Sequence, residues 1–378
     1  MVVSDDPELR ALAAELLPGL AARSGLPFLA PIRLVRRSRE ELVAFLEFKL
    51  TEEMSDEREA ALVQSYAMLG LVPGDLQLRE LLKSVYTEQV AGFYDPDSTA
   101  LFVLDDQPQA TLGPLLLHEL VHAVQDQSVD LAALTAPSVG NDRRSAASAA
   151  IEGHATLIMF EQMAEAMQGG PVDLGDIPDF ASQVRPALEM ARSQYPQLAR
   201  APRVIQESML LPYLEGAGFV QRLWMELPER TAPFGEWLPT STEQLLNPDR
   251  FLSTPRDEPT ELLITLDQGV IRHEDGLGAA EVLILMEEHA GVADATGWDG
   301  DRYVLFELNG ESGLVWASIW DSVADRDRFV NQLGAGLATF PGGGRLEARE
   351  FNGRPGAILS VGAATGVSVT SSGGGELP

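Results

Sequence analysis

The first part of the chain places hydrophobic positions at helical spacing, interrupted by one extended stretch. Leucines recur three and four residues apart over 7–22, which predicts a helix, and the apolar run 32–35 predicts a strand. Further helices are expected over 39–50, 59–69 and 76–85. The N-terminal part is therefore expected to be mainly helical.

The hydrophobic period changes to that of β-structure around residues 91–104. Two apolar stretches flank Asp95-Pro96-Asp97-Ser98, a strong turn signal, so a β-hairpin is expected with 100–104 as its second strand. A leucine- and valine-rich helix is expected over 111–127. A longer helix is expected over 144–167, after a polar loop.

The region after residues 255–259 has the pattern of a separate unit. Strands and helices alternate there in an order that predicts helices packed on an antiparallel sheet. The expected strands are 261–266, 303–308, 313–320, 346–351 and 357–361, and the expected helices are 278–289 and 324–337. From Ala363 the glycine- and serine-rich tail is expected to be disordered.

The chain therefore divides into two folded units. The first covers 1–255, with a helical part over about 1–88 and a candidate catalytic part over about 89–255. The second is an α+β domain over 256–362, followed by the tail 363–378.

Charge and composition narrow the choice of partners. The chain has 57 acidic and 27 basic residues among 378, a net charge of −30 that disfavours nucleic acid and anionic membrane surfaces. It has no apolar run long enough to span a membrane, and its first residues lack the features of a secretory signal. A soluble protein is expected. Its oligomeric state and compartment stay open, because an extracytoplasmic protein whose leader was removed would also show no signal.

The absence of cysteine restricts the chemistry that the chain can perform. Disulfides, thiolate metal sites and cysteine nucleophiles are excluded, so any metal must be bound by histidine or carboxylate side chains. The histidines are few, which keeps the search short: they are His118, His122, His154, His273 and His289. The last two lie among acidic residues and are expected to be ordinary surface residues.

The motif HExxH lies inside the expected helix 111–127. His118 and His122 are four residues apart and share one helix face, so both imidazoles can bind one metal ion. Glu119 then lies beside the open metal position, where it can take a proton from the attacking water and pass it to a leaving amine. The uncharged residues around the motif suit a buried active-site helix.

A catalytic zinc site needs a third protein ligand. The metzincin pattern is excluded, because Gln125 and Ser128 stand where it requires glycine and histidine. Glu152, in the later helix, is the preferred third ligand. His154 is its rival, and residues two apart on a helix point in different directions, so only one of the pair is expected to reach the metal.

HELVH followed by EGHAT resembles the gluzincins, the thermolysin-like zinc peptidases. A wider set of segments is similar to a family of uncharacterised bacterial proteins regarded as metallopeptidases, and this likeness covers most of the chain. The segments are Glu88–Pro96, His118–Gln127, Pro212-Tyr213 with Gly216 and Phe219-Val220, Ser241–Gln244, and Gly297-Trp298 to Trp320-Asp321. The resemblance implies an α+β fold: a mainly helical zincin-like metallopeptidase unit with a small edge sheet, then the smaller α+β domain.

The resemblance also implies roles for further residues. A tyrosine or histidine from a later segment would stabilise the reaction intermediate, and Tyr213 is the candidate, although a tyrosine packed in the core fits its sequence equally well. Thr156 stands where thermolysin has an aspartate that orients a histidine ligand, so Asp126 is a candidate for that task. The strand 100–104 would be a sheet edge that pairs with substrate, or simply an edge strand.

The function expected from these residues is zinc-dependent hydrolysis of peptide bonds in a peptide or protein substrate. His118, His122 and Glu152 would bind zinc (Zn2+), and Glu119 would act as base and then acid. Two alternatives stay open: a metal-holding, non-proteolytic binding or regulatory protein on a zincin scaffold, and an acidic interaction protein without metal.

Overall fold

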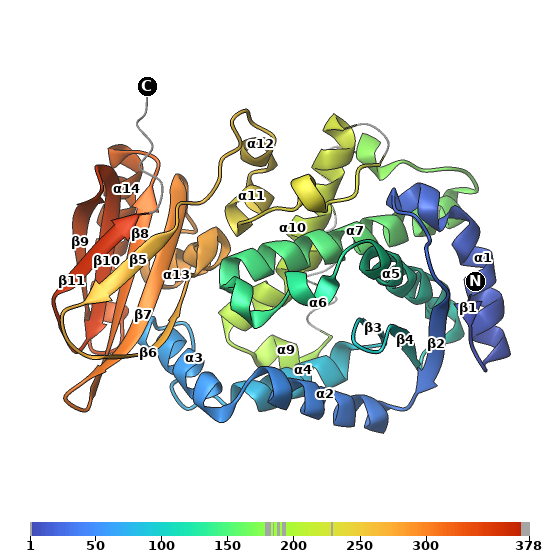
Figure 1. Cartoon of the computed structure of the whole chain (residues 1–378), viewed down its shortest axis with the longest axis horizontal. Coiled ribbons are helices and arrows are strands. Elements are labelled where there is room, and N and C mark those ends of the chain that lie inside the picture. The colour runs from blue at the N-terminus through green and yellow to red at the C-terminus, as the bar shows by residue number, and fades with distance from the viewer. Residues whose placement is uncertain are drawn as a thin grey trace.

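The computed structural model places a helical N-terminal part beside a β-rich C-terminal domain, so the expected α+β class is confirmed (Figure 1). The structure describes residues 2–177, 183, 185–186, 190, 194–227 and 230–371. Among them, none of the helices is both long and apolar enough to cross a membrane.

Capping side chains determine where the first helices begin. Asp6 accepts the backbone N–H groups of Glu8 and Leu9, and Ser38 forms a capping box with Glu41. Ser55 caps the third helix, which therefore begins three residues earlier than its leucine pattern suggested. The helices are α1 (Pro7–Ser24), α2 (Arg39–Glu53), α3 (Asp56–Met68) and α4 (Leu78–Gln89).

The small sheet has the strand order β1-β2-β4-β3. Its strands are β1 (Val2–Val3), β2 (Ile32–Arg37), β3 (Gly92–Asp95) and β4 (Ala100–Leu104). The expected hairpin is confirmed, since β3 and β4 pair antiparallel. The expectation that 100–104 is an edge strand is wrong: β4 is buried between β3 and β2, which runs parallel to it, and β3 is the edge.

Three long helices form the centre of the molecule. α7 (Asn141–Gln168) packs between α5 (Gln109–Ser128) and α10 (Arg203–Glu226). At the crossing of α7 and α10, a Cβ on Gly153 would lie 2.0 Å from the carbonyl carbon of Gly216, so only glycine allows this approach. Shorter helices surround them: α6 (Leu131–Leu134), α9 (Pro196–Arg200), α11 (Thr242–Leu246) and α12 (Pro248–Phe251).

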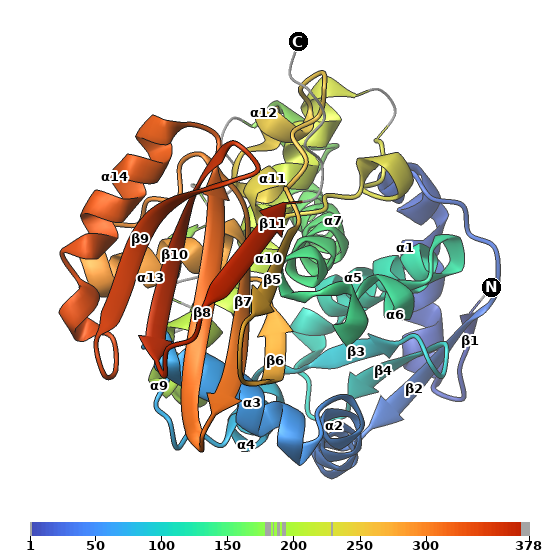
Figure 2. The same ribbon diagram turned by 60° about the vertical axis from the view of Figure 1, so that its left-hand side comes forward.

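The C-terminal domain is built on an antiparallel sheet of order β6-β7-β8-β10-β9. Figure 2 shows α13 and α14 on one side of it and the β5–β11 pair on the other, and buried apolar residues fill both interfaces. The elements are β5 (Leu262–Leu266), β6 (Val270–Asp275), α13 (Gly278–Ala290), β7 (Trp298–Leu308), β8 (Glu311–Trp320), α14 (Val323–Gly334), β9 (Gly344–Phe351), β10 (Arg354–Gly362) and β11 (Val367–Ser371).

The expectation of a disordered tail from 363 is wrong for β11. This strand pairs antiparallel with β5, which lies about a hundred residues earlier in the chain, and it covers part of the sheet. The last part of the expected tail, 372–378, lies outside the described residues.

The two parts of the molecule share a hydrophobic core. Tyr66 and Leu69 of the helical part and Val204 of α10 belong to the same buried cluster as Trp316 of the sheet. His289 on α13 is 7% exposed, and its Nε2 lies 2.7 Å from the Leu69 carbonyl oxygen. The expectation that His289 is a surface residue is therefore wrong, because α13 packs between the sheet and the helical part. His273 is half-buried, and its Nε2 lies 3.2 Å from the Tyr303 hydroxyl.

Candidate metal centre

Helix α5 presents the two histidines of the HExxH motif on one face. The ring centroids of His118 and His122 are 4.7 Å apart, and their Nε2 atoms lie 3.0 Å from each other. The surrounding residues of α5 are buried, which fixes the rotation of the helix about its axis. Both imidazoles therefore point to one place, as their spacing predicted.

Helix α7 brings Glu152 to the same place. Its Oε2 lies 3.1 Å from His118 Nε2 and 3.4 Å from His122 Nε2. Metal–ligand bonds of about 2.0–2.2 Å at tetrahedral angles give ligand atoms about 3.3 Å apart. The separations between these three donors therefore suit a single zinc-sized ion, and the donor set of two imidazoles and one carboxylate suits zinc.

The electrostatics of the three side chains favour a positive charge between them. Burial acts to lower the pKa of His122, but the charge of Glu152 and its hydrogen bond raise it to about 9. Burial acts to raise the pKa of Glu152, but the His122 charge and hydrogen bonds from both histidines hold it well below its usual range. A cation at this point therefore satisfies all three groups.

The Gln125 side chain hydrogen-bonds to the ring nitrogen of His122 that points away from the metal position. Its Oε1 lies 2.9 Å from His122 Nδ1, and its Nε2 lies 3.0 Å from the Ile151 carbonyl oxygen. A backbone carbonyl can only accept a hydrogen bond, so the amide nitrogen must face Ile151 and the amide oxygen must face His122. His122 Nδ1 therefore donates, and Nε2 keeps its lone pair for a metal.

His154 does not join the metal-binding group. It is fully buried against Trp224 and Phe234, and burial lowers its pKa to about 3. Its Nδ1 lies 3.1 Å from Gln125 Nε2, which must donate to it. The structure thus brings Glu152, and not its rival, to the two histidines.

Asp126 was a candidate for orienting a histidine ligand, and the structure places it elsewhere. Its carboxylate accepts a hydrogen bond of 2.8 Å from the Tyr94 hydroxyl and one of 3.3 Å from the backbone N–H of Leu131. Gln125 contacts the ligand instead: both residues lie on the His122 side of the helix, but the Asp126 carboxylate is taken up by Tyr94 and Leu131. That spacing was the signal that the sequence offered.

Glu119 lies in the same cleft as the three donors and is 6% exposed. Burial raises its pKa, the charges of His118 and His122 oppose the rise, and the backbone N–H of Tyr94 donates to its carboxylate. In β3, the bond from Leu104 N–H to the Ala91 carbonyl and the antiparallel register direct the backbone groups of Gly92 and Tyr94 away from β4. The free edge of β3 therefore faces Glu119.

Tyr213 lies on α10 with its ring 6.3 Å from the ring of His118. The charge of Glu152, followed in effect by that of Glu119, raises the pKa of Tyr213 well above the ordinary value. The side chain is 39% exposed and lines the cleft, which excludes the alternative of a tyrosine packed in the core. The close crossing of α7 and α10 at Gly153 and Gly216 brings Tyr213 near Glu152. Gly216 follows Tyr213 by about one turn, and Gly153 follows Glu152 directly.

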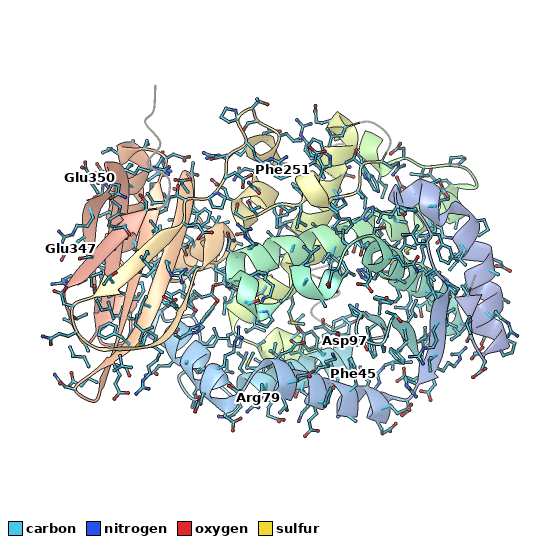
Figure 3. All side chains as sticks on the ribbon, in the orientation of Figure 1. Phe45, Arg79, Asp97, Phe251, Glu347 and Glu350 are labelled. Atoms are coloured by element: carbon cyan, nitrogen blue, oxygen red, sulfur yellow. The ribbon has the colours of Figure 1, made fainter. Side chains whose placement is uncertain are left out.

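The cleft has a volume of about 1210 Å³ and extends from the three donors to the C-terminal domain. Its walls come from β3, α4, α7, α10 and, at one end, α13. Phe45 of α2, labelled in Figure 3, stacks on Phe93 of β3 at 4.8 Å and supports the wall that carries the free edge.

A second acidic group lies between α11 and the C-terminal domain. Glu243, Asp257 and Asp321 come close together, but the Arg250 guanidinium already pairs with all three, at 3.3, 2.5 and 2.6 Å. Burial raises the pKa of Glu243 to about 8 despite this arginine. The guanidinium takes the place that a metal ion would need.

One comparison with known proteins found a match. Residues 262–371 match a family described as a domain of unknown function, DUF8575. These limits coincide with the start of β5 and the end of β11. Neither the curated proteins nor the solved structures gave a match.

Proposed function

We propose that this protein is a zinc-dependent hydrolase of peptide bonds, resembling the gluzincins. The observation that carries the proposal is the meeting of His118, His122 and Glu152 at 3.0–3.4 Å in a long cleft that also holds Glu119. A site with two imidazoles and one carboxylate, together with a separate buried carboxylate, suits hydrolysis by activated water.

Each residue has a distinct task in this proposal. When bound, zinc supplies Lewis-acid polarisation of the scissile carbonyl and makes water acidic enough to be deprotonated near neutral pH. Glu119 accepts the proton of the attacking water and delivers it to the leaving amine nitrogen. Tyr213 donates a hydrogen bond from its hydroxyl to the oxygen that gains negative charge as the carbonyl is attacked.

The substrate would bind in extended form along β3. The outward backbone groups of Gly92 and the outward carbonyl of Tyr94 offer main-chain hydrogen bonds that depend little on side-chain sequence, while the Tyr94 N–H already donates to Glu119. The sequence resemblance assigned this task to strand 100–104; in the structure the available edge is β3, next to Glu119. A peptide or unfolded protein segment therefore fits the cleft better than a small molecule.

The test compares peptide turnover by the zinc-loaded wild type with Glu119→Gln and, as a matched control, Glu288→Gln on the exposed side of α13. We expect Glu119→Gln to keep its zinc and lose turnover by about 10²–10⁴-fold, the range for a positioned acid–base group. The control should match the wild type. Equal turnover by Glu119→Gln would contradict the proposal. A wild type that holds zinc but cleaves nothing would favour the metal-holding, non-proteolytic alternative.

A further inference from the structure

The cleft contains one arginine that the rest of the described chain leaves unpaired. Arg144, Arg185 and Arg203 all line it. Arg185 pairs with Glu215, and Arg203 pairs with Glu287 across to α13. Among the described residues, Arg144 has no carboxylate partner, although acidic residues outnumber basic ones by 57 to 27 in this protein.

Helical geometry relates Arg144 to the metal centre. Positions 144, 148 and 152 of α7 are four residues apart and lie on one side of the helix, and all three line the cleft. At 1.5 Å per residue, Arg144 lies about 12 Å from Glu152 along the helix axis. Ser148, between them, adds a hydroxyl to the same wall.

Tyr86 of α4 lines the cleft near this stretch. Burial and the Glu53 charge raise its pKa, while the charge of Arg144 lowers it and that of Glu152 raises it. The Tyr86 hydroxyl is therefore within electrostatic range of both Arg144 and Glu152. A guanidinium with hydroxyl donors close by is a suitable set for a carboxylate, which accepts several hydrogen bonds in one plane.

We propose that Arg144, with Ser148 and Tyr86, forms a subsite for an acidic side chain of the substrate. The proposal rests on the peptidase function proposed above. An extended peptide advances about 3.3 Å per residue, so about 12 Å corresponds to an Asp or Glu about three to four residues from the scissile bond.

The net charge of the protein indicates which overall charge a substrate peptide should have. A charge of −30 repels strongly acidic peptides at long range, but this field is screened beyond about 8–10 Å in physiological salt. Inside the cleft the nearest groups set the preference, and Arg144 is a lining cation that no described carboxylate pairs with. The favoured substrate is therefore a peptide that is neutral or basic overall and carries a single acidic residue at one fixed position.

The experiment digests a proteome-derived peptide library with the zinc-loaded enzyme and locates the cleavage sites by mass spectrometry. The variants are Arg144→Gln and, as control, Arg143→Gln, whose exposed side chain lies outside the cleft. Matched peptides with Glu or Gln at the preferred position then give kcat/KM. We expect the wild type and Arg143→Gln to favour the Glu peptide by about tenfold or more. Arg144→Gln should cleave both peptides at the rate of the Gln peptide.

Each other outcome is decisive. If the wild type cleaves peptides without preference for an acid, or if Arg144→Gln keeps the preference, the acidic subsite is refuted and the peptidase function stands. If the zinc-loaded wild type cleaves no peptide in the library, the peptidase function fails and the subsite fails with it. Arg144→Glu gives a further check, because it should shift the preference to Lys or Arg at the same position.

Discussion

Gln125→Leu tests how the side chain that bonds to His122 Nδ1 supports the metal centre. The leucine fills a similar volume but leaves two side-chain nitrogens without their partner, His122 Nδ1 and His154 Nδ1, and removes a second hydrogen bond from the Ile151 carbonyl, which keeps its helical bond. Because Gln125 is fully buried, water cannot readily replace it. Each group left unsatisfied costs about 1–3 kcal/mol, so the folded state should lose at least about 2 kcal/mol.

The variant should also bind zinc more weakly. Without the amide oxygen, His122 can rotate and adopt the tautomer whose Nε2 carries the proton, and loss of such a partner weakens metal binding by about 10–100-fold. Zinc affinity is measured by competition with a chromophoric chelator, on protein shown to be folded by circular dichroism.

Two further variants separate metal positioning from general destabilisation. Gln127→Leu removes three hydrogen bonds from the same helix, but these groups are exposed and do not contact His122, so zinc affinity should not change. Gln125→Glu keeps an acceptor for His122 and loses the two donated bonds, so it should be less stable yet bind zinc close to the wild type. A folded Gln125→Leu that binds zinc as tightly as the wild type would refute the reasoning.

Two other predictions follow from packing and burial. A Cβ on Gly216 would lie 2.0 Å from the Ala149 carbonyl oxygen, so Gly216→Ala should lower the free energy of unfolding by about 1–3 kcal/mol in denaturant titrations; Gly113→Ala, with open space around its Cβ, should instead be neutral or stabilising. Burial raises the pKa of Glu281 to about 8 and of Asp301 to about 7, above their unfolded values near 4. Between about pH 4 and pH 7 to 8 the folded state therefore holds protons that the unfolded chain has released. The free energy of unfolding should fall as pH rises through this range, by up to about 1.4 kcal/mol per pH unit for each group. Glu281→Gln should flatten the fall between about pH 5 and pH 8, and an unchanged slope would contradict this assignment.

The part of the metal centre that the sequence predicted depends on local geometry. The spacing of His118 and His122 defines one helix face wherever the helix lies, and the scarcity of histidines left few choices for the third ligand. Residues two apart on a helix cannot point the same way, so only one of Glu152 and His154 could join the histidines, and the neighbouring Gly153 and the known set of two histidines and a glutamate favoured Glu152.

The features that the sequence did not predict depend on contacts between distant segments. β4 is a central strand only because β2, some seventy residues earlier, pairs beside it. β11 is ordered because β5 pairs with it, although its own residues resemble a flexible tail. His289 is buried because α13 packs against the helical part. No local pattern specifies such pairings.

Gln125 is an intermediate case. Its position three residues after His122 was visible in the sequence, but its task became clear only from the Ile151 carbonyl, which fixes the direction of the amide. Asp126, one residue later, lies on the side of the helix that faces Tyr94. A difference of one position therefore separates the residue that orients the ligand from one that supports the sheet.

The metal content of the natively purified protein tests the central claim most directly. Elemental analysis combined with native mass spectrometry should find one zinc per chain in the wild type, a strongly reduced content in His122→Ala and in Glu152→Ala, and an unchanged content in Glu288→Gln. A wild type that contains no zinc and takes up none, or a zinc content that survives loss of both His122 and Glu152, would contradict the account.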